Sequence, residues 1–162
     1  FGIPSSNFLQ IGLLSMIPWG VTAIVQVLWA WNSDRTGERR WHTAGGFAMC
    51  VVGMTMLAVI DGSPVLQLAA LTIVTSGALC WVVAFWSIPT SLLSGAAAAA
   101  GIAWINAIGN LGGFVAPNLR AWLDVVFAFS GAGLIGLGIV NVIGACFYAI
   151  APRKVISNGT SR

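Results

Sequence analysis

Charged residues are absent from four long stretches of the chain, residues 1–33, 41–60, 62–119 and 125–152. A helix that crosses a bilayer needs roughly 20 consecutive apolar residues. The stretch 62–119 is too long for a single helix, and Pro89 and Ser94-Gly95 supply turn-forming residues within it. The pattern therefore predicts five membrane-spanning helices, near residues 8–31, 44–60, 65–88, 92–118 and 125–151.

The composition supports a membrane protein. Of the 162 residues, 58% are hydrophobic and only 7% are charged, whereas soluble domains have about 25% charged residues. A soluble globular protein is excluded, because a surface that faces water needs more charge than this. We expect an all-α, polytopic membrane helix bundle whose surface is covered largely by membrane lipid.

The cations are divided unevenly between the two sides of such a bundle. Six of the seven Lys and Arg residues follow the first or the fifth span, and only Arg120 falls on the opposite side. Cytoplasmic connections carry an excess of Lys and Arg, so we expect the loop 32–43 and the tail 152–162 to be cytoplasmic. The segments expected outside are residues 1–7, 61–64 and 119–124. This topology accounts for the net charge of +3 without a nucleic-acid partner.

The chain has few groups that could carry out chemistry. Cys50, Cys80 and Cys146 lie in three different spans without the spacing of a thiol motif or zinc site, and we expect them to be packing residues. His42 is the sole histidine and has no companion ligands beside it. No base for a nucleophile lies within a span. We therefore expect no enzyme activity, no metal and no cofactor, which leaves transport, a channel or a structural role.

The connection after the first span has an unusual concentration of charge, Asp34-Arg35-Thr36-Gly37-Glu38-Arg39-Arg40. Asp34 can end one helix, and Gly37 permits the positive φ of a tight reversal. Arg39 and Arg40 can then approach both Asp34 and the carbonyl end of that helix. Such a loop forms a detachable electrostatic clamp. The alternative is a simple turn whose arginines only set the topology.

This loop resembles the signature of the major facilitator superfamily, whose fuller form is G-x-L-x-D-R-x-G-R-R. In that family the signature lies between the second and third helices of each six-helix half. Ala30 stands where the leading glycine is expected and Glu38 where a basic residue is commoner, and both departures favour the second half. The resemblance therefore implies that the five spans are helices eight to twelve of a twelve-helix carrier. The chain begins with Phe1 and lacks the basic region of a signal peptide, so we also expect an excerpt whose N-terminal half is missing.

Three further stretches are similar to the anion:cation symporter family within that superfamily. They are Asn7-Phe8 with Ile11 to Trp19, Phe85 to Thr90, and the run Asn106-Ala107-Ile108-Gly109-Asn110-Leu111-Gly112-Gly113. Members of this family carry small organic anions such as phthalate and tartrate, usually with protons. The resemblance implies a permease of the bacterial inner membrane, with a proton as coupling ion. Which anion is carried stays open.

The residues of the fourth span support a binding role without the resemblance. Asn106, Gly109, Asn110, Gly113 and Pro117 recur at helical spacing and make one face small and polar. Gly109 and Gly113 form a pair that permits close helix packing. Two carboxamides in the middle of a span are costly unless they are used. We therefore expect Asn106 and Asn110 to contact the transported anion.

A second polar stripe is predicted on the third span, at Thr72, Thr75, Ser76, Cys80, Trp86, Ser87 and Thr90. We expect Trp86, Ser87 and Thr90 to line the same cavity as the two asparagines. The alternative for Thr72, Thr75 and Ser76 is hydrogen bonding and packing between helices. For Trp86 the alternative is an anchor at the membrane interface.

The expected mechanism is alternating access, with substrate bound between two halves that rock around it. The cation that meets the anion and the acid that carries the proton are expected in the missing half, because no charged residue lies within a predicted span. The competing hypothesis is a small autonomous membrane protein that acts as a pore subunit or an assembly partner.

Overall fold

The computed structural model describes residues 7–150, which form five α-helices joined by short connections. The helices are α1 (Phe8–Thr36), α2 (Arg39–Val59), α3 (Pro64–Leu92), α4 (Gly95–Val126) and α5 (Ala132–Ile150). By length and composition, each could cross a membrane. In lipid a helix is the form that satisfies the backbone of a single apolar segment, so the predicted all-α bundle of five spans is confirmed. The predicted tail 152–162 lies outside the described residues.

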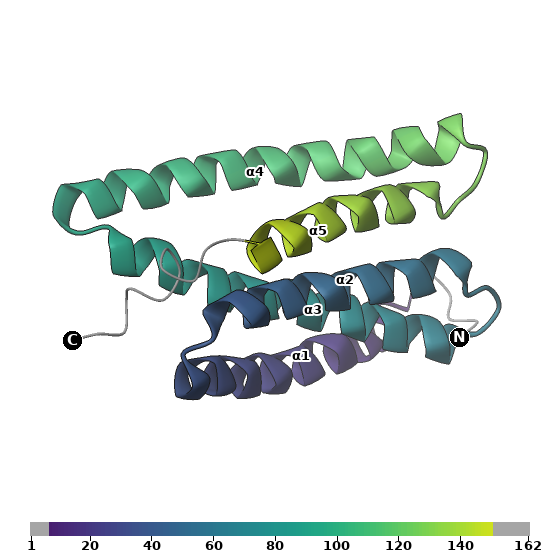
Figure 1. Ribbon diagram of the computed structural model, residues 1–162. Helices are drawn as coiled ribbons and strands as arrows, with labels where there is room; N and C mark the ends of the chain where they lie inside the picture. Colours follow the sequence, from purple (N-terminus) through teal and green to yellow (C-terminus); the bar gives the residue numbers. More distant parts are fainter. Residues whose placement is uncertain (1–6, 151–162) are drawn as a thin grey trace.

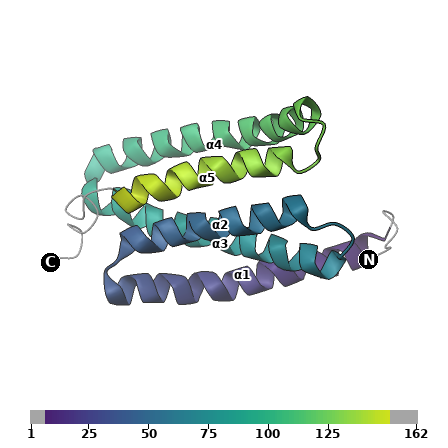
Figure 2. The same ribbon diagram turned by 45° about the vertical axis from the view of Figure 1, so that its right-hand side comes forward.

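The helices pack as a curved row rather than as a closed ring. α2 lies between α3 and α5, α1 packs against α3, and α4 lies along α5 (Figures 1 and 2). The connections α1–α2 and α3–α4 are at one end of the bundle, and α2–α3 and α4–α5 are at the other. None of the described side chains of α4 is buried, so this helix forms the open edge of the row.

The first connection is shorter than the predicted loop 32–43. α1 continues to Thr36 and α2 already begins at Arg39, so only Gly37 and Glu38 separate the two helices. The prediction was wrong here because it ended both helices where apolar residues give way to charge. Polar and charged residues are compatible with helix once they lie beyond the hydrocarbon core, and Gly37 alone supplies the left-handed residue that ends α1.

The boundary between the last two helices is also displaced. The predicted connection 119–124 is part of α4, which runs to Val126, and α5 starts at Ala132 instead of residue 125. Arg120 and Asp124 were taken to mark a loop, but they lie on the last turns of α4. The reversal uses residues 127–131, where Ala128 has φ 49°.

Glycines bring α2 and α3 into close contact at the centre of the bundle. A Cβ at Gly46 would lie 2.5 Å from the backbone nitrogen of Trp81, and one at Gly77 would lie 2.7 Å from the carbonyl oxygen of Gly46. Cys50 and Cys80 are both buried, and the Cys50 thiol donates to the carbonyl oxygen of Val74 at 3.6 Å. Small residues at a helix contact are a common means of association in membranes, and here they fix the core against which the other helices pack.

Candidate functional site

The residues Asp34–Arg40, called the clamp motif below, form the turn between α1 and α2 and have the geometry that a tight reversal requires. Gly37 ends α1 with φ 66° and ψ 4°, a conformation that residues with a Cβ adopt only at a cost. The Thr36 hydroxyl donates to the carbonyl oxygen of Asn32 at 2.8 Å and accepts the Glu38 backbone N–H at 3.4 Å. The turn therefore carries α2 back beside the end of α1.

Asp34 and Arg39 face each other across this turn. Arg39 Nη2 lies 3.1 Å from Asp34 Oδ1, and 65% of the Asp34 side chain is exposed. An ion pair this open to solvent contributes only about 0–1 kcal/mol to stability. Such a pair is weak enough to be broken during a conformational change. Arg35 takes no part in it, because its guanidinium lies over the Trp31 ring at 5.5 Å from the centroid.

Arg40 makes a contact with the far end of the chain that the sequence did not predict. Its Nη2 donates to the carbonyl oxygen of Ala149, at the C-terminal end of α5. The carbonyl end of a helix favours a positive charge, so this contact attaches the motif to α5. Arg40 Nε is buried and has no hydrogen-bond partner among the described residues.

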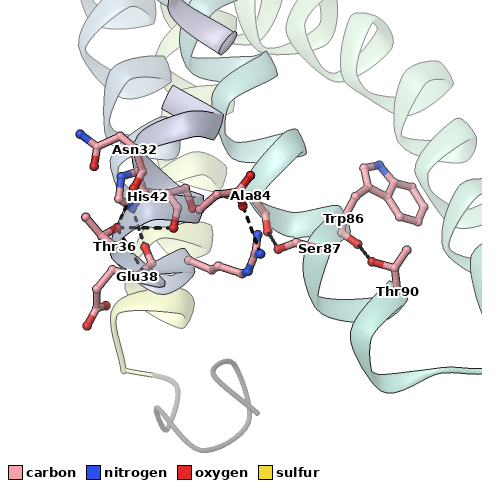
Figure 3. A network of polar contacts seen from close by, with 11 residues as sticks. Asn32, Thr36, Glu38, His42, Ala84, Trp86, Ser87 and Thr90 are labelled. Carbon is pink, nitrogen blue, oxygen red and sulfur yellow. Dashed lines mark hydrogen bonds and ion pairs between the residues drawn. The ribbon is translucent and has the colours of Figure 1, made fainter. Parts of the chain in front are cut away.

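Trp29 and His42 hold α1 and α2 together beside the motif. Trp29 Nε1 donates to the carbonyl oxygen of His42 at 3.2 Å, and the two rings pack edge to face with centroids 5.3 Å apart. His42 Nδ1 lies 2.5 Å from the carbonyl oxygen of Glu38 within α2. Figure 3 shows His42 close to Asn32, Thr36 and Glu38. His42 is thus a packing residue of α2, where a loop residue had been expected.

A chain of hydroxyls joins α1 to the polar stripe of α3. Thr22 Oγ1 lies 2.8 Å from Thr75 Oγ1 and 3.1 Å from Ser76 Oγ, and Thr22 is completely buried. Thr75 also donates to the carbonyl oxygen of Leu71 at 3.1 Å. If Ser76 donates to Thr22 and Thr22 donates to Thr75, each of the three hydroxyls donates one hydrogen bond. Of the two alternatives for Thr75 and Ser76, the structure supports hydrogen bonding between helices. Sequence analysis missed Thr22, because it is an isolated hydroxyl in an apolar span.

The predicted binding residues of α3 lie near the same end of the bundle as the clamp motif (Figure 3). Ser87 donates to the carbonyl oxygen of Ala84 at 2.7 Å, and Thr90 donates to that of Trp86 at 2.7 Å. Both hydroxyls are thus bonded within their own helix, on either side of Pro89. Thr90 is exposed, and Trp86 and Ser87 are partly exposed.

Asn106 and Asn110 are exposed on α4. Neither carboxamide hydrogen-bonds to another described residue. A Cβ at Gly109 or Gly113 would meet no atom within 4 Å, so the described helices supply no packing partner for these glycines.

The structure does not join the asparagines and the α3 residues into one site. α4 makes little contact with α3 beyond their connection and lies along α5 instead (Figures 1 and 2). At 1.5 Å per residue, Asn110 lies about 20 Å farther from that connection than Thr90 does. A cavity that includes both sets would need walls from outside the described helices.

Comparisons with known proteins place the chain in a family of membrane transporters. The sequence model of the Major Facilitator Superfamily matches residues 1–117. A protein of Agrobacterium vitis named "Putative tartrate transporter" is 42% identical over 160 residues, which cover 98% of this chain and 36% of that protein. A second of the same name and organism is 40% identical over 156 residues, covering 94% of this chain and 34% of that protein.

A more distant relative is the "Inner membrane transport protein RhmT" of Escherichia coli K12. It is 38% identical over 133 residues, which cover 82% of this chain and 30% of that protein. No solved structure matches the chain. The chain spans about a third of the length of these relatives. With a family match over residues 1–117 and relatives that are transporters rather than enzymes, the chain belongs to the major facilitator superfamily.

Proposed function

We propose that the chain is part of a longer secondary active transporter that carries small organic anions together with protons by alternating access. The observation that carries the proposal is the exposed polar face of α4. Asn106 and Asn110 lie one helical turn apart on this face without a hydrogen-bond partner among the described residues. Two free carboxamides in mid-span are costly against lipid, and a water-filled cavity removes that cost.

The comparisons support the substrate class. Two relatives that are 42% and 40% identical to this chain are named for tartrate, a small organic dianion. Neutral amide donors at Asn106 and Asn110 would orient a carboxylate or hydroxyl of such a solute. Trp86, Ser87 and Thr90 would line the same cavity from α3 at another depth, because Asn110 lies about 20 Å farther from the α3–α4 connection than Thr90.

The rest of the carrier would supply what this chain lacks. Among residues 7–150, acidic and basic side chains occur only at helix ends and in connections. The cation that balances the anion and the acid that carries the proton would therefore lie in the N-terminal half. Substrate would bind between the two halves.

The orientation follows from the cations. We propose that the α1–α2 turn and the C-terminus are cytoplasmic in a bacterial inner membrane, because six of seven Lys and Arg residues fall on that side. The α2–α3 and α4–α5 connections would then face the periplasm.

Uptake by the full-length carrier in proteoliposomes tests the function. Labelled tartrate and an aromatic acid such as phthalate would be offered with and without an inward proton gradient. We expect accumulation of at least one anion that a protonophore abolishes. Accumulation that persists with the protonophore would rule out proton coupling. Absence of uptake of any organic anion would rule out the proposed substrate class.

A further inference from the structure

A groove between α4 and α5 is lined by Arg120. Among the described residues, Arg120 is the one Lys or Arg at the end of the bundle opposite the clamp motif. The groove has a volume of about 500 Å³ and includes both Arg120 and Asp124. Its other lining residues are Ala116, Pro117, Ala121 and Leu137. This volume falls within the ~300–1,000 Å³ range of small-molecule sites.

The stem of Arg120 is held firmly while its charged group remains available. A Cβ at Gly133 would lie 2.5 Å from both Cγ and the carbonyl oxygen of Arg120, so the start of α5 packs directly on this stem. The Arg120 side chain is nevertheless 52% exposed. Its guanidinium donates no hydrogen bond to another described residue.

Asp124 forms an open ion pair with Arg120 one helical turn away, but it accepts no hydrogen bond from the guanidinium. Asp124 Oδ1 accepts the backbone N–H of Gly133 at 2.7 Å, in the first turn of α5. Its other oxygen lies 3.9 Å from Arg120 Nε, too far for a hydrogen bond. Asp124 is thus engaged at the α5 N-terminus, and the N–H donors of Arg120 remain free for an anion.

The groove continues the polar face of α4. Asn106, Asn110, Gly113, Pro117, Arg120 and Asp124 follow one another at alternating intervals of four and three residues, which keeps them on one side of a helix. The groove on the other flank of α4 is lined by Leu123, Phe127, Phe129, Ala132, Ile135, Gly136 and Ile139 and has no charged residue. The charges therefore gather on the flank that leads to the asparagines. Arg120 lies about 15 Å from Asn110 along the helix axis.

We propose that Arg120 forms an anion-capture site at the periplasmic mouth, from which a carboxylate solute passes along α4 to Asn110 and Asn106. This inference rests on the proposed function. A cation in a cleft attracts anions and raises their rate of encounter. The same guanidinium chemistry would also bind the phosphate of a lipid headgroup, so the test must separate the two anions.

The test compares Arg120→Gln, Arg120→Lys and Asp61→Asn in the full-length carrier. Asp61 lies in the α2–α3 connection at the same end of the bundle and does not line the groove. Asp61→Asn changes the charge of this end by +1 where Arg120→Gln changes it by −1, so a general effect of surface charge would lower KM in Asp61→Asn. Initial uptake of the anion that the wild-type carrier transports would be measured at low and high salt. Co-purified phospholipid would be quantified by native mass spectrometry.

We expect Arg120→Gln to raise KM about fivefold at low salt with little change in kcat, and to weaken the salt dependence of uptake. Arg120→Lys should restore most of the affinity, and Asp61→Asn should leave KM unchanged, whereas a lowered KM in Asp61→Asn would indicate a general effect of surface charge. Unchanged KM with loss of bound phospholipid would identify a lipid contact and overturn the capture site, and unchanged KM with unchanged lipid would overturn it equally. In both of these outcomes, uptake of organic anions by the wild-type carrier would still support the proposed function, and only the capture site would be ruled out.

Discussion

Arg40, near the start of α2, donates a hydrogen bond to the carbonyl oxygen of Ala149, at the end of α5. The two residues are 109 positions apart in the sequence. The contact ties the turn after α1 to the C-terminal helix. It also explains why Arg40 is not equivalent to Arg39, which pairs with Asp34.

Replacing Arg40 by Met should destabilise the carrier by about 1–2 kcal/mol, because a charge-assisted hydrogen bond to a helix end is lost. Part of that loss is offset, since Arg40 Nε is buried without a partner among the described residues. Thermal unfolding in detergent would measure the change. Arg35→Met is the matched control, because Arg35 contacts the exposed Trp31 ring. Equal losses for both variants would contradict a specific role for the Ala149 contact.

Asp34→Asn tests whether the turn is a clamp or only a topology signal. The variant keeps the shape of the side chain but removes the charge that faces Arg39. We expect a change in stability of no more than ~1 kcal/mol together with a slower transport cycle, measured as kcat in proteoliposomes. Transport at the wild-type rate would mean that the charges of this loop serve only to orient the protein.

Thr22→Val should weaken the contact between α1 and α3. The substitution removes the hydroxyl that links Thr75 to Ser76 and leaves Ser76 buried with a lost partner. Such a loss costs about 1–2 kcal/mol. Thr55→Val is the matched control, because its exposed hydroxyl bonds only to Val51 of its own helix. Unfolding midpoints that shift equally for the two variants would argue against the interhelical hydroxyl chain.

The proposed orientation can be checked by cysteine labelling in intact cells. Thr36 is exposed at the end of α1, so a cysteine there should resist an impermeant reagent added from outside. Asp61→Cys, in the exposed α2–α3 connection, should be labelled. Both variants need Cys146 replaced by Ser, since it is the exposed native cysteine among the described residues. Efficient labelling at position 36 would show that the protein has the opposite orientation.

The sequence predicted the number and type of helices because gaps between charges report membrane thickness directly. It misplaced the ends of several helices for the same reason. Arg120 and Asp124 were assigned to a loop, whereas Asp124 uses its carboxylate to bind the start of α5 while remaining in α4. Charge marks where the hydrocarbon ends, and a helix can continue beyond that point.

Contacts between distant segments could not be predicted from one sequence. The pairing of Asp34 with Arg39 follows from a tight turn and was expected. The partners of Arg40 and Ser76 depend on which helices are neighbours, and the row of α1, α3, α2, α5 and α4 is not encoded in any local pattern. The polar face of α4 was visible in the sequence because Asn106 and Asn110 repeat at helical spacing.

Asn110→Ala is expected to weaken substrate affinity, or to change selectivity, more than it lowers the amount of folded carrier. The Asn110 carboxamide has no hydrogen bond to another described residue, so its removal breaks nothing within these helices. Asn118→Ala is the matched control on the same helix, because the Asn118 amide donates to the carbonyl oxygen of Phe114 at 2.7 Å. Uptake kinetics and the yield of folded protein would be measured for both. A structure of the whole carrier in which both Asn106 and Asn110 bond only to a neighbouring helix, sealed from the cavity, would contradict the assignment, as would unchanged kinetics in Asn110→Ala.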